Sequence, residues 1–252
     1  MKRSRLFSGL GIALSGLFGP RLVSAIVYGS AVSDDFTKTS DIDCLIFLRD
    51  PTVEDLRALK SLRQQYRTRG VRLDINVHAS TNTPSARPTA FWHHNRALFC
   101  EIDMQTVGKV VAGDDIFGHL VLNTHDLRLE AVRGINALLY ETRKLLVNKR
   151  VTQTEKTSVI KWCLYAMIYA LGAHNIFSAS KKRGVLLFER EYPEIMSPKR
   201  FLTLKRLGAK GLTRADLCLA HDFLSKLDRT VYAEYVGSGT SAYRTAASKT
   251  HA

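Results

Sequence analysis

A glycine–serine pair and three aspartates, each beside a short apolar segment, constrain this fold more than any other feature. Gly29 and Ser30 end one apolar segment, and ten residues separate them from Asp41, which is followed by Asp43 at the start of a second segment. Asp74 lies inside a third segment, in which apolar and polar side chains alternate. Each piece alone is a weak signal, but this order predicts that one β-sheet gathers a phosphate-binding turn and three carboxylates.

The glycine–serine pair has the properties of a turn that holds phosphate. Gly29 has no Cβ, so the backbone can turn tightly there and approach a phosphate closely. The Ser30 hydroxyl and the amides that follow can donate hydrogen bonds to phosphate oxygens, especially if a helix begins at Ala31. The sequence therefore predicts nucleotide binding by Gly29 and Ser30.

The aspartates indicate a divalent metal. Asp41 and Asp43 are two positions apart at the start of a strand expected over residues 42–48, so both point to one face of the sheet. Two carboxylates on one face repel each other unless a cation lies between them. Hard oxygen ligands suit Mg²⁺ or Mn²⁺.

Asp74 is expected on the same polar side of the sheet. Val71, Leu73, Ile75 and Val77 alternate with polar residues and would face a core, which leaves Asp74 on the opposite face. The predicted metal ligands are Asp41, Asp43 and Asp74. The alternative is that the turn is ordinary and that the aspartates are solvated strand ends.

Residues 26–30 (IVYGS), 40–46 (SDIDCLI) and 73–75 (LDI) together resemble the signature of the DNA-polymerase-β-type nucleotidyltransferase superfamily. The compact size and helical second half are more similar to its minimal and aminoglycoside nucleotidyltransferases than to its polymerases. Many relatives carry an Ala-Arg-Gly stretch after the glycine and serine. This chain has Ala31-Val32-Ser33 there, without the arginine.

The resemblance implies an enzyme that transfers a nucleotidyl group from a nucleoside triphosphate to an acceptor hydroxyl and releases pyrophosphate, with two metal ions. Asp41, Asp43 and Asp74 would be the catalytic residues. Lys181 and Lys182 would bind the nucleotide, with Lys161 as a further candidate, and Glu130 is a candidate base; the acceptor is left open as a small molecule, a protein or RNA. The alternative is a nucleic-acid-binding or antitoxin-like regulatory protein on the same scaffold.

The predicted fold class is α+β. A small mixed-sheet catalytic domain is expected over residues 1–120, an all-helical bundle over 121–236 and a disordered tail over 237–252. In the first domain, a capping box at Thr52 begins a helix that ends near Thr68. Further expected elements are a short helix over 91–99, a strand over 100–104, an edge strand over 107–114, and bundle helices over 126–147, 155–177, 184–192, 198–207 and after Thr213.

The positive charge is concentrated in the second half. The chain has a net charge of +14, and 22 of its 37 Lys and Arg, but only 11 of its 23 Asp and Glu, lie from Asp126 onward. This distribution favours an anionic partner and predicts possible contact of the helical half with nucleic acid. It argues against a cationic acceptor such as an aminoglycoside. The alternative is a solvated basic face.

The remaining composition indicates a cytoplasmic protein without a membrane segment. Four isolated cysteines (Cys44, Cys100, Cys163 and Cys218) are expected to be buried free thiols in a reducing compartment. The basic and apolar residues 2–14 resemble a targeting segment, but we expect an integral first helix there. His93 and His94 lack partners at metal-ligand spacing, so they are not expected to bind zinc.

Overall fold

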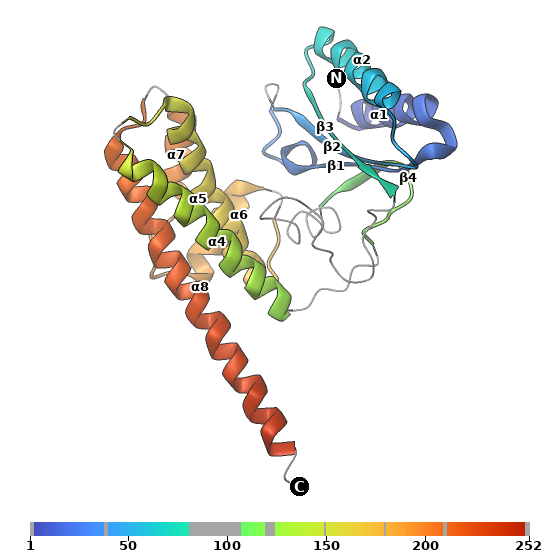
Figure 1. The fold of residues 1–252 in the computed structure, drawn as a ribbon. Coiled ribbons are helices and arrows are strands. Elements are labelled where there is room, and N and C mark those ends of the chain that lie inside the picture. The colour runs from blue at the N-terminus through green and yellow to red at the C-terminus, as the bar shows by residue number, and fades with distance from the viewer. Residues whose placement is uncertain are drawn as a thin grey trace. The chain divides into compact units, whose positions relative to one another are not determined.

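The computed structural model describes residues 3–37, 40–80, 107–118, 124–148, 150–178, 180–208 and 211–249, with side chains up to residue 237. The chain forms two compact units (Figure 1). We call residues 1–93 with 97–121 the sheet unit and residues 94–96 with 122–252 the helical unit. The fold is α+β, as predicted.

The sheet unit is built on a mixed four-stranded sheet of order β3-β2-β1-β4. Its strands are β1 (Leu22–Tyr28), β2 (Ile42–Leu48), β3 (Leu73–Ala79) and β4 (Lys109–Gly113). β1 pairs antiparallel with β2 and β4, and β2 pairs parallel with β3. The parallel pair is connected by helix α2 (Val53–Thr68), which supplies the crossover that such a pair requires.

One face of the sheet is covered by α1 (Arg3–Phe18) and α2 (Figure 1). Alternate strand residues, among them Ile42, Cys44 and Ile46, form one core with Leu10 and Leu14 of α1. The apolar run near the N-terminus is therefore part of this core, as expected of an integral helix. Alternation then places the intervening strand residues on the opposite face.

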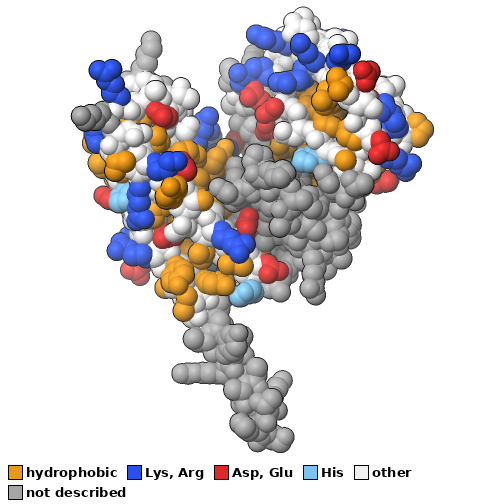
Figure 2. All heavy atoms as spheres, viewed as in Figure 1, with side chains coloured by type: hydrophobic (Ala, Val, Ile, Leu, Met, Phe, Trp, Pro, Cys, Tyr) orange, Lys and Arg blue, Asp and Glu red, His pale blue; other side chains and the backbone are white. Residues whose placement is uncertain are grey.

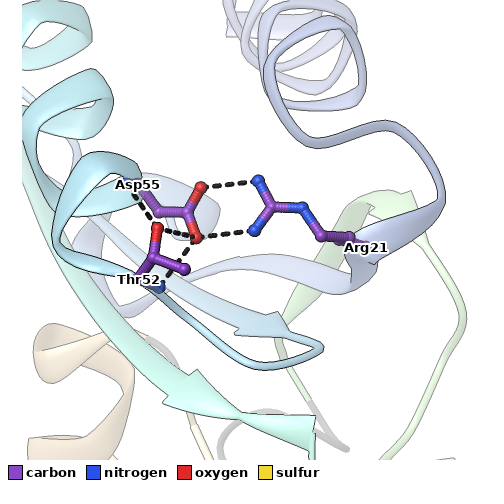
Figure 3. Close-up of polar contacts among 3 residues, drawn as sticks. All are labelled: Arg21, Thr52 and Asp55. Carbon is purple, nitrogen blue, oxygen red and sulfur yellow. Dashed lines mark hydrogen bonds and ion pairs between the residues drawn. The ribbon is translucent and has the colours of Figure 1, made fainter.

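The capping box predicted at Thr52 is present, and an ion pair ties it to Arg21, the residue before β1. The Asp55 carboxylate accepts hydrogen bonds from the Thr52 backbone amide and hydroxyl, and the Thr52 hydroxyl accepts from the Asp55 amide (Figure 3). Both Asp55 oxygens also accept from Arg21, at 2.6 and 2.8 Å. These contacts hold the start of α2 beside the start of β1, and the Arg21 hydrogen bonds keep the pKa of the buried Asp55 carboxyl well below its usual range.

The helical unit contains α4 (Thr124–Val147), α5 (Gln153–Ala173), α6 (Lys181–Glu191), α7 (Lys199–Leu207) and α8 (Arg214–Lys249). α5 is buried along most of its second half and contacts α4, α6, α7 and α8, so it is the central helix of this unit. α6 begins at Lys181, three residues before the expected start. Within the described part of the chain, no helix is long and apolar enough to cross a bilayer.

Two expectations need correction, and several others concern residues that are not described. The tail predicted to be disordered from residue 237 is instead helical as far as Lys249. The chain has no proline after Pro198, and the two glycines at 237 and 239 each cost only about 1 kcal/mol in a helix, so no residue there stops it. Cys218 is exposed, whereas Cys44 and Cys163 are buried as predicted. Cys100, the histidine pair and the elements expected over 91–104 lie outside the described residues.

Candidate functional site

The β-sheet places two of the predicted aspartates side by side. Asp43 of β2 is the register partner of Asp74 on β3, and on its other side it pairs with Tyr28 of β1. Neighbouring strands lie about 4.8 Å apart, and register partners point to the same face. The neighbours of Asp43 in the strand, Ile42 and Cys44, belong to the core on the helix-covered face. Asp43 and Asp74 therefore share the opposite face.

The glycine–serine turn lies directly against Asp43. Gly29 has φ +66°, a left-handed conformation, and it begins a short 3₁₀ turn, Gly29–Val32. A Cβ at Gly29 would lie 2.7 Å from the Asp43 carboxylate oxygen Oδ2, closer than atoms can pack. Only glycine satisfies both conditions without strain. Ser30 lies within this turn, where its carbonyl accepts a hydrogen bond from the Ser33 amide at 3.2 Å.

Asp41 is held by an arginine that the sequence did not suggest. Its Oδ1 atom lies 2.5 Å from Nε of Arg72, and both side chains are about half exposed. Asp41 directly precedes β2, and Arg72 directly precedes β3. Because the first strand residues, Ile42 and Leu73, are register partners, Asp41 and Arg72 face each other one position before them. The structure thus brings Asp43 and Asp74 together and places Asp41 in an ion pair at the same end of the sheet.

The residues on this face have the donor chemistry of a Mg²⁺ site, although the described residues hold no ready-made one. Within the ranges described, no group of three or more His, Cys, Asp or Glu is arranged to hold a metal ion. The available donors are nevertheless hard carboxylate oxygens at one end of one sheet, which is the donor type that Mg²⁺ prefers. Asp43 and Asp74 supply such oxygens from neighbouring strands, and Asp41 would supply another if Arg72 were displaced.

A second arginine reaches the turn from α1. Nη1 of Arg3 donates a hydrogen bond of 2.6 Å to the Ser33 carbonyl, and Nη2 lies 3.9 Å from Asp34. This guanidinium therefore lies on the loop in which the sequence lacks the family's arginine. No local signal could have revealed it, because the two partners are 30 residues apart in the chain.

The rest of this face is a small second core. Phe47 stacks on His78 with ring centroids 5.5 Å apart and meets Phe117 edge-on at 5.9 Å. Near the aspartates, the Asn76 amide donates to the Tyr28 hydroxyl at 3.4 Å. The aromatic contacts lie toward the C-terminal ends of β2 and β3, at the opposite ends of these strands from Asp43 and Asp74.

Cys44 does not take part in this chemistry. Its thiol points into the core on the helix-covered face, and burial, with a smaller contribution from the Asp43 charge, raises its pKa to about 12. A thiol with such a pKa remains protonated at neutral pH and is a poor nucleophile.

The other candidates lie in the helical unit. Lys181 and Lys182 stand in the first turn of α6, whose N-cap Ser180 accepts a hydrogen bond from the Arg183 amide. Lys161 is exposed on α5, and Glu130 lies on α4.

The comparison with protein families identifies the domain that carries the glycine–serine turn. Residues 13–88 match the model described as the nucleotidyltransferase domain. This stretch contains α1 from Ala13, the strands β1 to β3, the turn at Gly29 and all three aspartates. This part of the sheet unit is therefore similar to a nucleotidyltransferase domain, as the motifs predicted. No curated protein matches the chain.

The fold extends this similarity over both units. The chain resembles the crystal structure of spectinomycin adenyltransferase AAD(9) from Enterococcus faecialis with ATP and spectinomycin, with a TM-score of 0.57. The match covers 90% of this chain and 99% of that chain, at 12% sequence identity. At this identity the likeness establishes the fold alone: a mixed sheet with helices followed by a helical region.

Proposed function

We propose that this chain uses its nucleotidyltransferase domain to transfer a nucleotidyl group from a nucleoside triphosphate to an acceptor hydroxyl, with Mg²⁺ as the cofactor. The observation that carries the proposal is the contact between the left-handed turn at Gly29 and the carboxylate of Asp43, which lies beside Asp74. A phosphate bound at this turn lies within reach of both carboxylates. Binding and catalysis would therefore share one end of the sheet.

In the proposed reaction, the acceptor oxygen forms a bond to the α-phosphorus, the bond to the β-phosphate oxygen breaks, and pyrophosphate leaves. The turn at Gly29 and Ser30 would hold the triphosphate through its amides and hydroxyl. Asp41, Asp43 and Asp74 would hold Mg²⁺, which neutralises phosphate charge when bound. The acceptor proton would pass to Asp74 or to Glu130, the two carboxylates we consider as base.

Lys181 and Lys182 are the proposed contacts from the helical unit. With Arg183 they place three cations in the first turn of α6, where the helix dipole is already positive. Such an arrangement is unfavourable for the helix alone and becomes favourable beside an anion. A triphosphate or its pyrophosphate product is an anion of this kind.

ATP is the first donor to test, because the structurally similar adenyltransferase was solved with ATP. That enzyme's other ligand was spectinomycin. The excess of positive charge from Asp126 onward favours an anionic acceptor over a cationic one. We leave its class open among small molecules, proteins and RNA.

A pyrophosphate-release assay across the four nucleotides, with Mg²⁺ and candidate acceptors, tests the proposal. Asp43→Asn and Asp74→Asn keep the shape of each side chain but remove its charge, so both should lower turnover by on the order of 10²-fold or more. Chelation of the metal should have the same effect. Circular dichroism should show that both variants remain folded.

Asp50→Asn is the matched control. Asp50 lies two residues after the end of β2 and is exposed. Its φ of 45° is a conformation that asparagine tolerates. This variant should keep wild-type turnover. Unchanged turnover in Asp43→Asn and Asp74→Asn would show that the proposed catalytic carboxylates are wrong.

A further inference from the structure

A second polar site lies on the sheet unit, between α2 and the start of β3. A cavity of about 260 Å³ opens there and is lined by Lys60, Arg63, Gln64, Arg67, Arg72 and Leu73. Figure 2 shows Lys and Arg side chains gathered over the region where Figure 1 places α2. Four of the six described lining residues are cationic and none is acidic.

The helical spacing of α2 brings these cations together. Lys60, Arg63 and Arg67 follow one another at intervals of three and four residues, so they share one face of the helix. Nε of Arg63 donates a hydrogen bond of 3.1 Å to the Leu73 carbonyl, which anchors its guanidinium at the edge of β3. Arg72 adds a fourth charge from the strand side.

The acidic residues of α2 do not offset this charge. Glu54 pairs with Arg57, and Asp55 pairs with Arg21, both in the first turn of the helix. Arg72 is paired with Asp41, but Lys60, Arg63 and Arg67 still place three like charges around one small cavity, and an anion that enters it offsets their mutual repulsion. The cavity therefore has the electrostatics of an anion site.

We propose that this cavity binds the phosphate groups of an anion. Guanidinium groups match phosphate oxygens with two parallel hydrogen bonds, and the Gln64 amide can add a neutral donor. The volume lies slightly below the roughly 300–1,000 Å³ of pockets that enclose drug-sized ligands, so it suits a phosphate or pyrophosphate group. Through Arg72, which also pairs with Asp41, the cavity borders the proposed metal site, but phosphate binding there does not require the proposed reaction.

Calorimetric titration with inorganic pyrophosphate, at low salt and with EDTA present, tests this site directly. EDTA removes the metal that binding at the aspartates would need. The double variant Lys60→Gln/Arg67→Gln should bind pyrophosphate on the order of tenfold more weakly than the wild type, because two charged partners are lost. Higher salt should weaken wild-type binding, since the lining charges are exposed and screened.

Arg5→Gln/Arg57→Gln is the matched control. Both residues are exposed, lie in the sheet unit outside the cavity, and change the net charge by the same amount. This variant should bind pyrophosphate within about twofold of the wild type, a change too small for a lost partner. Equal weakening in the two double variants would mean a diffuse field and would overturn the proposal, as would wild-type protein that binds no pyrophosphate.

Two further titrations identify which kind of phosphate compound binds in the cavity. They also distinguish this site from the proposed active site. Binding of a thymidine 12-mer that is tighter than that of pyrophosphate and is lost in Lys60→Gln/Arg67→Gln assigns the cavity to a nucleic-acid backbone. Preference for pyrophosphate or ATP with the same loss assigns it to a small anion. Asp43→Asn should keep metal-free pyrophosphate binding while losing transfer, so either proposal can fail without the other.

Discussion

Gly29 is needed for two reasons, its backbone conformation and its missing side chain. Its left-handed backbone forms the turn, and its missing side chain leaves room for the Asp43 carboxylate. A glycine in this motif is often explained by its approach to phosphate alone. Here the protein itself already occupies the space that a Cβ would need, so the turn and the carboxylate are fitted to each other.

Gly29→Ala should therefore lower both stability and turnover. A left-handed alanine costs roughly 1–2 kcal/mol, and its Cβ would push the Asp43 carboxylate away. Gly70→Ala is the control, because Gly70 has φ +75° but no described atom lies within 4 Å of the place that a Cβ would take. It should lose similar stability in urea unfolding but keep turnover. Equal turnover in the two variants would show that the contact with Asp43 is not needed.

The Arg21–Asp55 contact gives a pH-dependent contribution to stability. Because the folded pKa of Asp55 is lowered, this contribution is fully present above the unfolded value of about 3.9 and is lost as the pH falls below it. Asp55→Asn should cost about 1–3 kcal/mol at pH 7. Urea unfolding at pH 7 and pH 3 should show a smaller difference from wild type at pH 3; a constant difference would contradict the assignment. Glu54→Gln, at an exposed pair, is the control.

At the scale of elements, patterns within a few residues predicted much of the fold. The capping box at Thr52 set the start of α2, and the alternation around Asp74 set the faces of β3. The contacts that the sequence could not reveal join distant segments. Arg72 meets Asp41 across two strands, and Arg3 meets Ser33 from another helix, so both depend on packing rather than on local pattern.

The α4–α5 contact depends on a glycine in the same way. A Cβ at Gly134 of α4 would lie 2.6 Å from the ring of Tyr169 on α5, which is buried. Gly134→Ala should therefore destabilise the protein by about 1–3 kcal/mol through overpacking. Gly16 lies in α1, and no described atom lies within 4 Å of the place that its Cβ would take. Gly16→Ala should instead stabilise the protein by about 0.5–1 kcal/mol. Thermal unfolding of both variants checks the opposite signs; stabilisation by Gly134→Ala would mean that the helices separate at little cost.

The whole molecule combines a nearly neutral first half with a strongly basic second half. From Asp126 onward, Lys and Arg outnumber Asp and Glu by two to one. The alternation in the strands predicted which face of the sheet is polar. Net charge could not predict which cations bind a ligand, because it does not say where the charged residues lie in the fold. The structure now separates two clusters by element: Lys181, Lys182 and Arg183 on α6, and Lys199, Arg200, Lys205 and Arg206 on α7.

We predict that the α6 cluster contributes more to nucleotide binding. Changing Lys181, Lys182 and Arg183 to Ala should weaken binding of a fluorescent nucleotide with Mg²⁺ by on the order of tenfold. The four-residue change on α7 removes more charge and should have the smaller effect. Equal weakening would indicate a diffuse field with no defined contact. If neither variant bound the nucleotide more weakly, the basic residues would be a solvated surface, and a neutral or cationic small-molecule acceptor would again be a candidate.

Among the strands that the structure describes, β3 lies at the edge of the sheet, and this position has a consequence for self-association. An edge strand exposes backbone groups that can pair with the same strand of another copy and so extend the sheet between molecules. Arg63 already occupies the Leu73 carbonyl, and a second copy approaching this edge would bring its own Lys60, Arg67 and Arg72 against the first set. We therefore expect the arginines and the lysine beside β3 to oppose pairing of two copies of the chain through this edge.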